Sequence, residues 1–347
     1  MSKPKQDLRE THPHGTLVLP SVTIDSYSLE LQSEGELIGD QASQTAFRAL
    51  LGEWRERLWD GDQDPFGRKA SDALSKKKLD RAANGRDAAA VLTIELVVEE
   101  FSQRLANVAH TFLQQSVWRG VERIIVGGGF KQSEVGKQAI RRAHKLLKET
   151  GFEGDMVPLR HEADDGGLMG WVHLAPPELL EGRDAILAVD IGGTNVRCGI
   201  VELHKDPKKL RVIEREKWRH ADDGVVGKDL IEGIVEMLGT QIASAKKAGI
   251  SLSPFIGIAC PGIIRSDGSI ARGAQNLPDD WQRASFHLPR RLHENIPSLG
   301  GAASVVLMHN DAVVQGLSEL PFVEDTQRWA VLTVGTGLGN ASFTNRH

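Results

Sequence analysis

The sequence is poor in cysteine, lacks long apolar runs and contains no block of like charge. Its 347 residues include only two cysteines, Cys198 and Cys260, each beside an apolar run. Two thiols are too few for a disulfide framework or a cysteine-based zinc site, so we expect buried thiols in a reducing compartment. No segment approaches the roughly 18 apolar residues of a membrane span, and the first fifteen residues hold no apolar signal region. We therefore expect a cytoplasmic protein without a membrane partner.

The charge is almost balanced, with 42 basic and 47 acidic residues and a formal net charge of −5. Neither sign forms a long run, so the sequence shows no electrostatic footprint for nucleic acid. The expected partner is a small molecule. A chain of this length has room for two domains, each with its own core.

Apolar runs typical of strands alternate with amphipathic stretches typical of helices, which predicts an α/β fold. The polar stretch 60–87 is expected to lie on the surface, and a domain junction is expected between Pro176 and Asp184. The pattern predicts helices over 41–59, 88–116, 133–150 and 228–248, and strands near 121–127, 185–203, 212, 255–260, 304–310 and 329–343.

Glycine-rich turns follow apolar strands at three places: "DIGGTN" (190–195), "GTGLG" (335–339) and "GGG" (127–129). Glycines let backbone N–H groups converge on a phosphate, and the threonines add hydroxyl donors. Asp190 at the mouth of the first turn is suited to Mg²⁺. Each turn alone is equally compatible with an ordinary tight turn. Because neither the dinucleotide fingerprint nor the Lys-Ser/Thr phosphate loop is present, a Rossmann dehydrogenase and a P-loop enzyme are disfavoured.

The segment "MHNDAVVQG" places Asn310 and Asp311 between an apolar strand and a helix. A carboxylate there can act as the general base on a hydroxyl in phosphoryl transfer. The alternative is that Asp311 only caps the helix.

Four motifs taken together resemble the ROK sugar kinases of the hexokinase and actin superfamily. They are, in chain order, "DIGGTNVRCGIV", "GIACPGII" with "GAQNLPDDW", "HNDAVVQGLSE" and "VLTVGTGLGNA". The resemblance implies two actin-like/ribonuclease-H-like α/β lobes with a cleft between them. It also implies ATP-dependent phosphorylation of a sugar hydroxyl, on glucose or a related hexose or N-acylhexosamine, and it allows a homodimer.

The resemblance assigns roles residue by residue. Asp311 would be the catalytic base, Asn310 and Asn276 would bind sugar, and Asp190 would hold Mg²⁺ through water. The ATP phosphates would be lined by Asp190, Gly192, Gly193, Thr194 and Asn195 and by Gly335, Thr336 and Gly337, and adenosine by Gly127, Gly128 and Gly129.

Two features of the family are missing. The zinc loop is absent, so no zinc site is expected, and no Glu-x-Gly-His segment occurs near the N-terminus. His12 and His14 stand in that region, either as sugar ligands or as solvated tail residues. For the family's later sugar-binding Glu, the chain offers Glu36 or Asp40, and the register to "ASQTAF" favours Asp40.

The order of the family's segments appears circularly permuted. The part that follows the second phosphate motif in the family resembles "DAAAVLTIELVVEEFSQRLANVAHTFL", "VERIIVGGGF" and "RHEADDGGLMGWVHLAP", all of which precede residue 177 here. We therefore expect an adenosine-type lobe over 1–176, a phosphate and sugar lobe over 185–322, and a hairpin over 323–347 that completes the first lobe.

Two other functions are compatible with the same fold. One is a non-catalytic sugar-binding regulator, which the presence of Asp311 and both phosphate turns disfavours. The other is a polyphosphate-dependent glucokinase, for which a basic groove would be expected in place of the glycine triplet.

Overall fold

The computed structural model describes residues 13–33, 35–225, 227–274, 277, 280–283 and 285–346. The chain divides into two compact units. Unit 1 holds the described residues of Met1–Ser28, Asp164–Asp325 and Asn345–His347, and unit 2 holds those of Leu29–Ala163 and Thr326–Thr344. Each unit has its own sheet and hydrophobic core, and the α/β class predicted from the sequence is confirmed.

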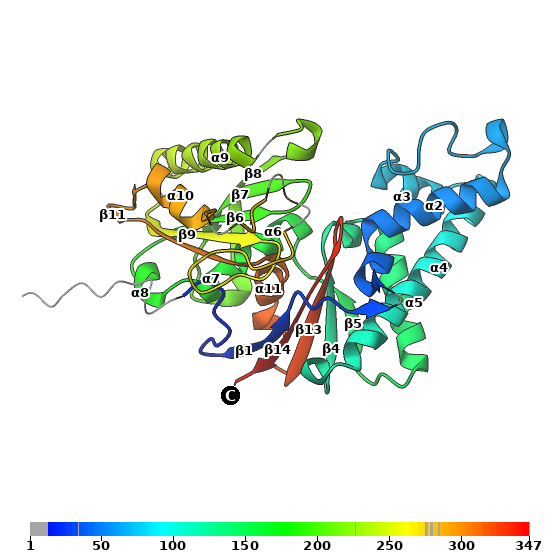
Figure 1. The fold of residues 1–347 in the computed structure, drawn as a ribbon, viewed down its shortest axis with the longest axis horizontal. Coiled ribbons are helices and arrows are strands. Elements are labelled where there is room, and N and C mark those ends of the chain that lie inside the picture. The colour runs from blue at the N-terminus through cyan, green and yellow to red at the C-terminus, as the bar shows by residue number, and fades with distance from the viewer. Residues whose placement is uncertain are drawn as a thin grey trace, which may run out of the picture. The chain divides into compact units, whose positions relative to one another are not determined.

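The sheet of unit 1 has five strands in the order β12-β9-β6-β7-β8 (Figure 1). The first three strands along the chain form an antiparallel meander, β6 (Ala185–Ile191), β7 (Val196–Glu202) and β8 (Arg211–Trp218). Two later strands, β9 (Leu252–Cys260) and β12 (Val305–Asn310), add in parallel on the other side of β6. This arrangement fits the ribonuclease-H-like lobe that the motifs imply.

Both faces of this sheet are covered, because β6 and β9 are buried along their whole length. Helices α9 (Gly227–Ala248) and α10 (Leu288–Asn295) pack on one face. On the other face, Trp171 of α7 (Trp171–Leu174) lies against Gly257, where an added Cβ would be 2.2 Å from the indole ring. Both cysteines are buried and unpaired, as predicted.

The four sheet strands of unit 2 follow the same plan with a different chain order. The antiparallel hairpin is β13 (Arg328–Val334) and β14 (Leu338–Asn345), and the parallel strands beside β13 are β4 (Arg123–Gly127) and β5 (Asp155–Pro158). In unit 1 the hairpin comes before the parallel strands along the chain. In unit 2 the hairpin begins at Arg328, 170 residues after Pro158 at the end of β5.

Helices α2 (Gln44–Leu58), α4 (Ala88–Leu113) and α5 (Glu134–Glu149) form the core of unit 2 with this sheet. Their bounds agree with the predicted helices to within a few residues. The stretch 60–87 is not wholly irregular, because α3 (Lys76–Ala83) forms there and buries Leu79.

The remaining regular elements are short. The strands are β1 (Val22–Tyr27), β2 (Gln32–Ser33), β3 (Glu36–Leu37), β10 (Ser298–Leu299) and β11 (Ala302–Ala303), and the helices are α6 (Ala163–Met169), α8 (Pro177–Leu180) and α11 (Asp311–Leu317).

Candidate active site

The predicted phosphate turn and the Asn-Asp motif meet at one edge of the unit 1 sheet. Strands β6, β9 and β12 are parallel, so their carboxyl ends lie together, where an open α/β sheet commonly binds its ligand. The register pairs Asp190 with Ala259, and Cys260 with Asn310. Two predicted site segments that are 120 residues apart in the sequence therefore end next to the same central strand.

Asp311 is the first residue of α11, and Asn310 is the residue that caps this helix. The alternative in which Asp311 serves only as the cap is therefore wrong. The Asp311 carboxyl accepts hydrogen bonds from two backbone N–H groups, that of Ala312 at 2.9 Å to Oδ1 and that of Asp311 itself. Burial, reinforced by the negative charge of Asp190, raises the pKa of Asp311 to about 7.

The side chain of Asn310 uses all its hydrogen-bonding capacity within the protein. Its Oδ1 accepts from the N–H groups of Ala312 and Val313, and its Nδ2 donates to Gly262 O and Ser28 Oγ, both at 3.0 Å. An amide has two donor hydrogens and two acceptor lone pairs, so nothing is left over for a ligand. A sugar contact by Asn310 would have to replace one of these bonds.

Asp190 belongs to a buried ionic cluster that the sequence analysis missed. Arg197 lies directly opposite it on β7 and donates to Asp190 Oδ2 at 3.0 Å and to Asp164 Oδ1 at 2.5 Å. Burial raises the pKa of Asp190, against the effect of the Arg197 charge. Burial raises the pKa of Asp164 as well. The positive charges and hydrogen bonds of Arg197 and Lys217 together outweigh this effect, so the pKa of Asp164 is lowered overall.

The signal for this cluster was available in the sequence. A hairpin that turns at 192–195 pairs Asp190 with Arg197, which places opposite charges directly across from each other on its two strands. Gly167 of the "DDGGLMG" segment lies beside the same carboxylate, since a Cβ there would be 2.7 Å from Asp190 Cγ.

Asp190 fits water-mediated Mg²⁺ binding as a single carboxylate. Mg²⁺ in phosphoryl-transfer sites is held by one or two carboxylates together with waters and phosphate oxygens. Oδ2 of Asp190 is engaged by Arg197, while no described residue donates to Oδ1. Within the described ranges, no cluster of three or more His, Cys, Asp or Glu side chains could hold a metal ion alone.

The first phosphate turn is braced by the short helix at His220–Asp222. His220 is buried, and its Nε2 lies 2.9 Å from Gly192 O, while the N–H of Ala221 donates to Thr194 O at 3.3 Å. The buried contact of His220 with Gly192 makes this histidine a support of the turn.

In unit 2, the other two glycine turns are in direct contact with each other. Gly128 has φ +78°, and a Cβ on it would be 2.4 Å from the carbonyl oxygen of Val334, the residue before Gly335. Gly335 closes a tight turn by donating to Gly337 O at 2.9 Å. The predicted adenosine segment 127–129 and the predicted phosphate segment 335–337 thus lie at the ends of adjacent parallel strands, β4 and β13.

The predicted sugar ligands are only partly described. Asn276 and His12 lie outside the described residues. His14 Nδ1 accepts the N–H of Met308 at 3.0 Å. Strand β12 is at the edge of its sheet, so His14 supplies a partner for one of its backbone donors. Asp40 and Glu36 belong to unit 2, and both are exposed.

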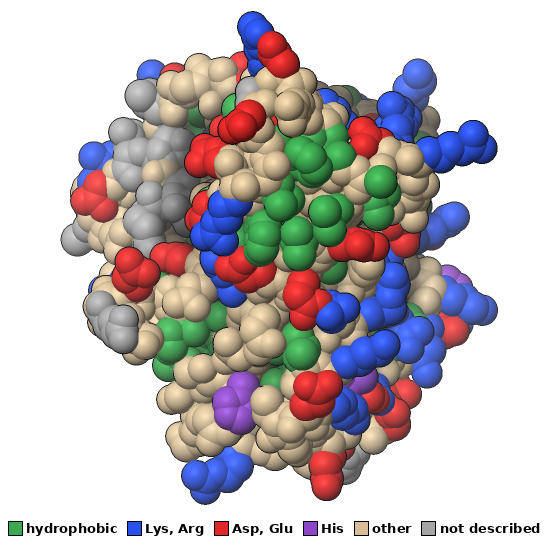
Figure 2. Space-filling model, turned by 90° about the vertical axis from the view of Figure 1, so that its right-hand side faces the viewer, with side chains coloured by type: hydrophobic (Ala, Val, Ile, Leu, Met, Phe, Trp, Pro, Cys, Tyr) green, Lys and Arg blue, Asp and Glu red, His purple; other side chains and the backbone are tan. Residues whose placement is uncertain are grey.

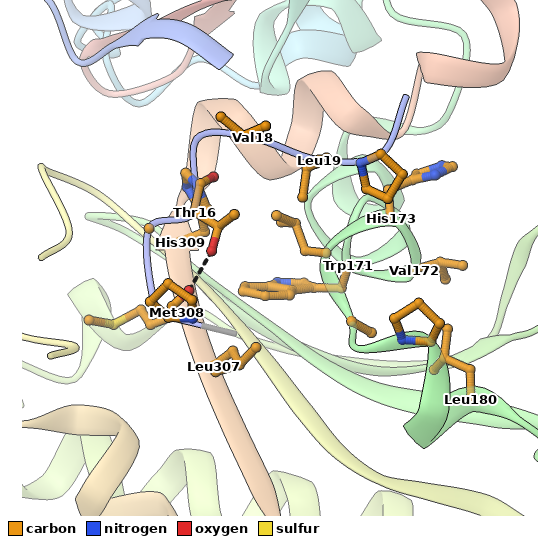
Figure 3. Close-up of a pocket in the computed structure, with 16 residues that line it drawn as sticks. Thr16, Val18, Leu19, Trp171, Val172, His173, Leu180, Leu307, Met308 and His309 are labelled. Atoms are coloured by element: carbon orange, nitrogen blue, oxygen red, sulfur yellow. Dashed lines mark hydrogen bonds between the residues drawn. The ribbon is translucent and has the colours of Figure 1, made fainter. Parts of the chain in front are cut away.

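A separate pocket of about 300 Å³ lies on unit 1, between the segment 13–20, α7–α8 and β12 (Figure 3). Its walls are mostly apolar and include Trp171, Leu19 and Leu307. His309 lines it too, donating through Nε2 to Thr16 O; burial lowers the pKa of His309 to about 4, so the ring is neutral. None of the predicted site residues lines this pocket.

Lys, Arg, Asp and Glu side chains are interspersed on the face shown in Figure 2, with no large area of one sign. Among the described residues, no helix is long and apolar enough to cross a membrane.

No protein-family model matches the chain, and no curated protein matches it. Solved structures of sugar kinases are similar to it. A ROK family glucokinase from Streptomyces griseus, in complex with glucose and AMPPNP, is 23% identical with a TM-score of 0.35, over 47% of this chain and 46% of that one. A ROK hexokinase from Thermus thermophilus is 23% identical with a TM-score of 0.27, over 37% and 35%. A hexokinase from Schistosoma mansoni complexed with glucose is 14% identical with a TM-score of 0.34, over 78% and 55%.

The chain thus spans about half the length, or less, of the ROK structures that it matches. At TM-scores this low, the similarity adds nothing on substrate or mechanism.

Proposed function

We propose that this protein transfers the γ-phosphoryl group of ATP to a hydroxyl of a sugar, a hexose or an N-acylhexosamine, with Asp311 as the general base. The observation that carries the proposal is the position and protonation of Asp311. Its carboxyl lies at the carboxyl end of a parallel strand, at the same sheet edge as the first predicted phosphate turn, and burial raises its pKa to about 7. A base poised near the working pH is effective at taking a proton from an attacking hydroxyl.

Each glycine turn would serve the phosphates through its backbone. In unit 1 the turn 192–195 follows Asp190, and in unit 2 the turn 335–337 lies against the segment 127–129. Converging N–H groups stabilise phosphate charge, which is the main task of the protein in phosphoryl transfer. The adenosine would lie at 127–129, as the sequence resemblance implies.

Asp190 would orient Mg²⁺ through a water molecule on its Oδ1. When bound, the ion neutralises phosphate charge. Arg197 holds the carboxylate in place, and its charge partly offsets the rise that burial causes in the pKa of Asp190.

We also propose that the chain order of unit 2 is permuted relative to the ROK kinases. The support is internal to the chain: both units build a hairpin with two parallel strands beside its first strand, but only unit 1 places the hairpin first. The domain bounds expected from the sequence, 1–176, 185–322 and 323–347, belong to this proposal.

A coupled ADP-release assay tests the function. Mg·ATP is offered with a panel of hexoses and N-acylhexosamines, and polyphosphate replaces ATP in a parallel series with sugar-phosphate detection. We expect turnover with ATP and at least one sugar. Turnover with polyphosphate alone would contradict the assignment of the donor, and sugar binding without any turnover would favour a sugar-binding regulator.

A further inference from the structure

We propose that the first turn of α2 orients the second glycine hairpin, and that Gln44 and Thr45 are positioning residues for a phosphate chain bound there. This inference rests on the proposed function, which places ATP phosphates at residues 335–337.

The two residues anchor three consecutive backbone carbonyls of the hairpin. The N–H of Gln44 donates to Gly335 O at 2.8 Å, and its side-chain Nε2 donates to Val334 O at 3.2 Å. Thr45 Oγ1 donates to Thr336 O at 2.8 Å. The Gln44 N–H is one of the backbone donors at a helix start that find no partner inside their own helix, and here the hairpin supplies the acceptor.

Anchoring the carbonyls fixes where the neighbouring N–H groups point. In a planar trans peptide, the carbonyl of one residue and the N–H of the next point in opposite directions. Because the carbonyls of Gly335 and Thr336 point to α2, the N–H groups of Thr336 and Gly337 point away from it. Successive N–H groups on one side of a turn form a concave site for an anion.

The first glycine hairpin has the same arrangement with unrelated residues. His220 Nε2 lies 2.9 Å from Gly192 O, and the Ala221 N–H donates to Thr194 O. The N–H groups of Gly193 and Asn195 are therefore also turned to the opposite side. The same construction therefore occurs once in each unit, with the carbonyls of the hairpin held from one side and its N–H groups turned to the other.

Thr45 is the better residue to test, because its side chain is exposed and forms no part of the core. Thr45→Val removes the hydroxyl and keeps the shape, while Thr45→Ser keeps the hydroxyl. Thr111→Val is the matched control: Thr111 Oγ1 also donates to a backbone carbonyl, Asn107 O at 2.9 Å, but that carbonyl belongs to α4 and not to a glycine turn.

The readouts are calorimetric dissociation constants for inorganic tripolyphosphate, ATP and adenosine, together with kcat and KM for ATP. We expect Thr45→Val to raise the dissociation constants for tripolyphosphate and ATP about tenfold and to leave that for adenosine unchanged, because the substitution removes one orienting hydrogen bond. KM for ATP should rise by a similar factor with kcat within about twofold, the pattern of lost uniform binding. Thr45→Ser and Thr111→Val should behave as wild type.

Several results would overturn the inference: no tripolyphosphate binding by the wild type, equal binding by Thr45→Val, or an equal loss of adenosine binding in that variant. The failure of the proposed function looks different. If the wild type binds tripolyphosphate and Thr45→Val does not, yet no sugar is phosphorylated, the positioning role stands and the kinase function falls. If sugar is phosphorylated and Thr45→Val matches wild type, the kinase function stands and the positioning role falls.

Discussion

At the scale of single residues, the surroundings of a carboxyl decide its role. Asp190 and Asp311 lie at the same edge of one sheet, but only Asp190 is paired with a guanidinium. No positively charged group among the described residues acts on Asp311, and burial raises its pKa to about 7. The paired carboxylate is suited to holding a metal ion, and the unpaired one is suited to accepting a proton.

The pH profile of kcat/KM should report the ionisation of Asp311. The base must be deprotonated to act, so kcat/KM is expected to rise with pH up to about 7 and to level off above it. A profile of initial rates from pH 5 to 9 measures this. A flat profile between pH 5 and 8 would contradict the role of Asp311.

The stability of the protein should change with pH in the opposite sense. Between pH 4 and 7 the folded protein keeps a proton on Asp311 that the unfolded chain has lost, so the free energy of unfolding falls as pH rises through this window. The Asp311→Asn variant has no carboxyl at this position and so lacks this contribution to the pH dependence of unfolding. Its stability relative to wild type should therefore increase from pH 4 to pH 8 in urea titrations, and an unchanged difference would show that the pKa is not raised.

Arg197→Met should destabilise unit 1 by about 3–5 kcal/mol, because the buried Asp190 loses its counter-charge and the buried Asp164 keeps only Lys217. Arg211→Met provides the comparison, since Arg211 pairs with Glu202 on the same sheet at the surface and should cost less than about 1 kcal/mol. Urea unfolding of both variants at pH 8 measures the difference. Similar losses in the two variants would show that the Arg197 cluster is not stabilising.

Whether a site residue could be predicted depends on whether the residues that identify it are close to it in the sequence. Asp190, Asp311 and the glycines stand in contiguous motifs, and the structure places them at strand ends. Asp164 reaches Arg197 from a segment 33 positions away, and no local pattern announces such a pairing. The same holds for His220, whose contact with Gly192 depends on how β8 returns to the turn.

At the scale of elements, the glycine turns of unit 2 depend on close backbone approach. Gly128→Ala should destabilise the protein by about 2–5 kcal/mol, because a Cβ would meet the Val334 backbone at 2.4 Å and would also occupy a left-handed conformation. Gly151→Ala separates the two effects. Gly151 has φ +92° with no atom within 4 Å, so only the conformational cost of about 1–2 kcal/mol applies.

Thermal and urea unfolding of the two variants provide the measurement. Equal losses for Gly128→Ala and Gly151→Ala would show that the contact between the two glycine turns is not tight.

The predictable elements are the long, strongly periodic ones. Helices α4 and α5 bury a residue about every third or fourth position, and β6 and β9 are mostly apolar and buried at every position. Helix α3 was missed because it has eight mostly charged residues and buries only Leu79. Its N-cap, Ser75, which accepts the N–H of Lys78, was the one local sign of it.

At the scale of the whole chain, the order of segments governs how unit 2 can form. Strand β13 lies between β14 and β4, and Ala330, Leu332 and Val334 of β13 belong to the core of the unit. Local patterns predict each strand but not its partner. The family resemblance implied only that the C-terminal hairpin completes this lobe, and the pairing of Trp329 with Arg123 is seen in the structure.

A chain that ends at Asp325 should therefore fail to form unit 2. We expect the amides of β4, α4 and α5 to exchange rapidly in hydrogen-exchange mass spectrometry of this truncated chain, and slowly in the full chain. The missing segment supplies the central strand and part of the core, so no other element can replace it. Strong protection of α5 in the truncated chain would contradict the pairing of β13 with β4.

The most direct test of the central claim is the transfer of γ-phosphate from Mg·ATP to a sugar hydroxyl by the wild type and by Asp311→Asn. Asp206→Asn is the matched control, because the Asp206 carboxylate also accepts a backbone N–H at the start of a helix, but it is exposed. We predict transfer to at least one sugar, a loss of about a hundredfold or more in Asp311→Asn, and wild-type activity in the control. Absence of transfer by the wild type, or full activity of Asp311→Asn, would contradict the account.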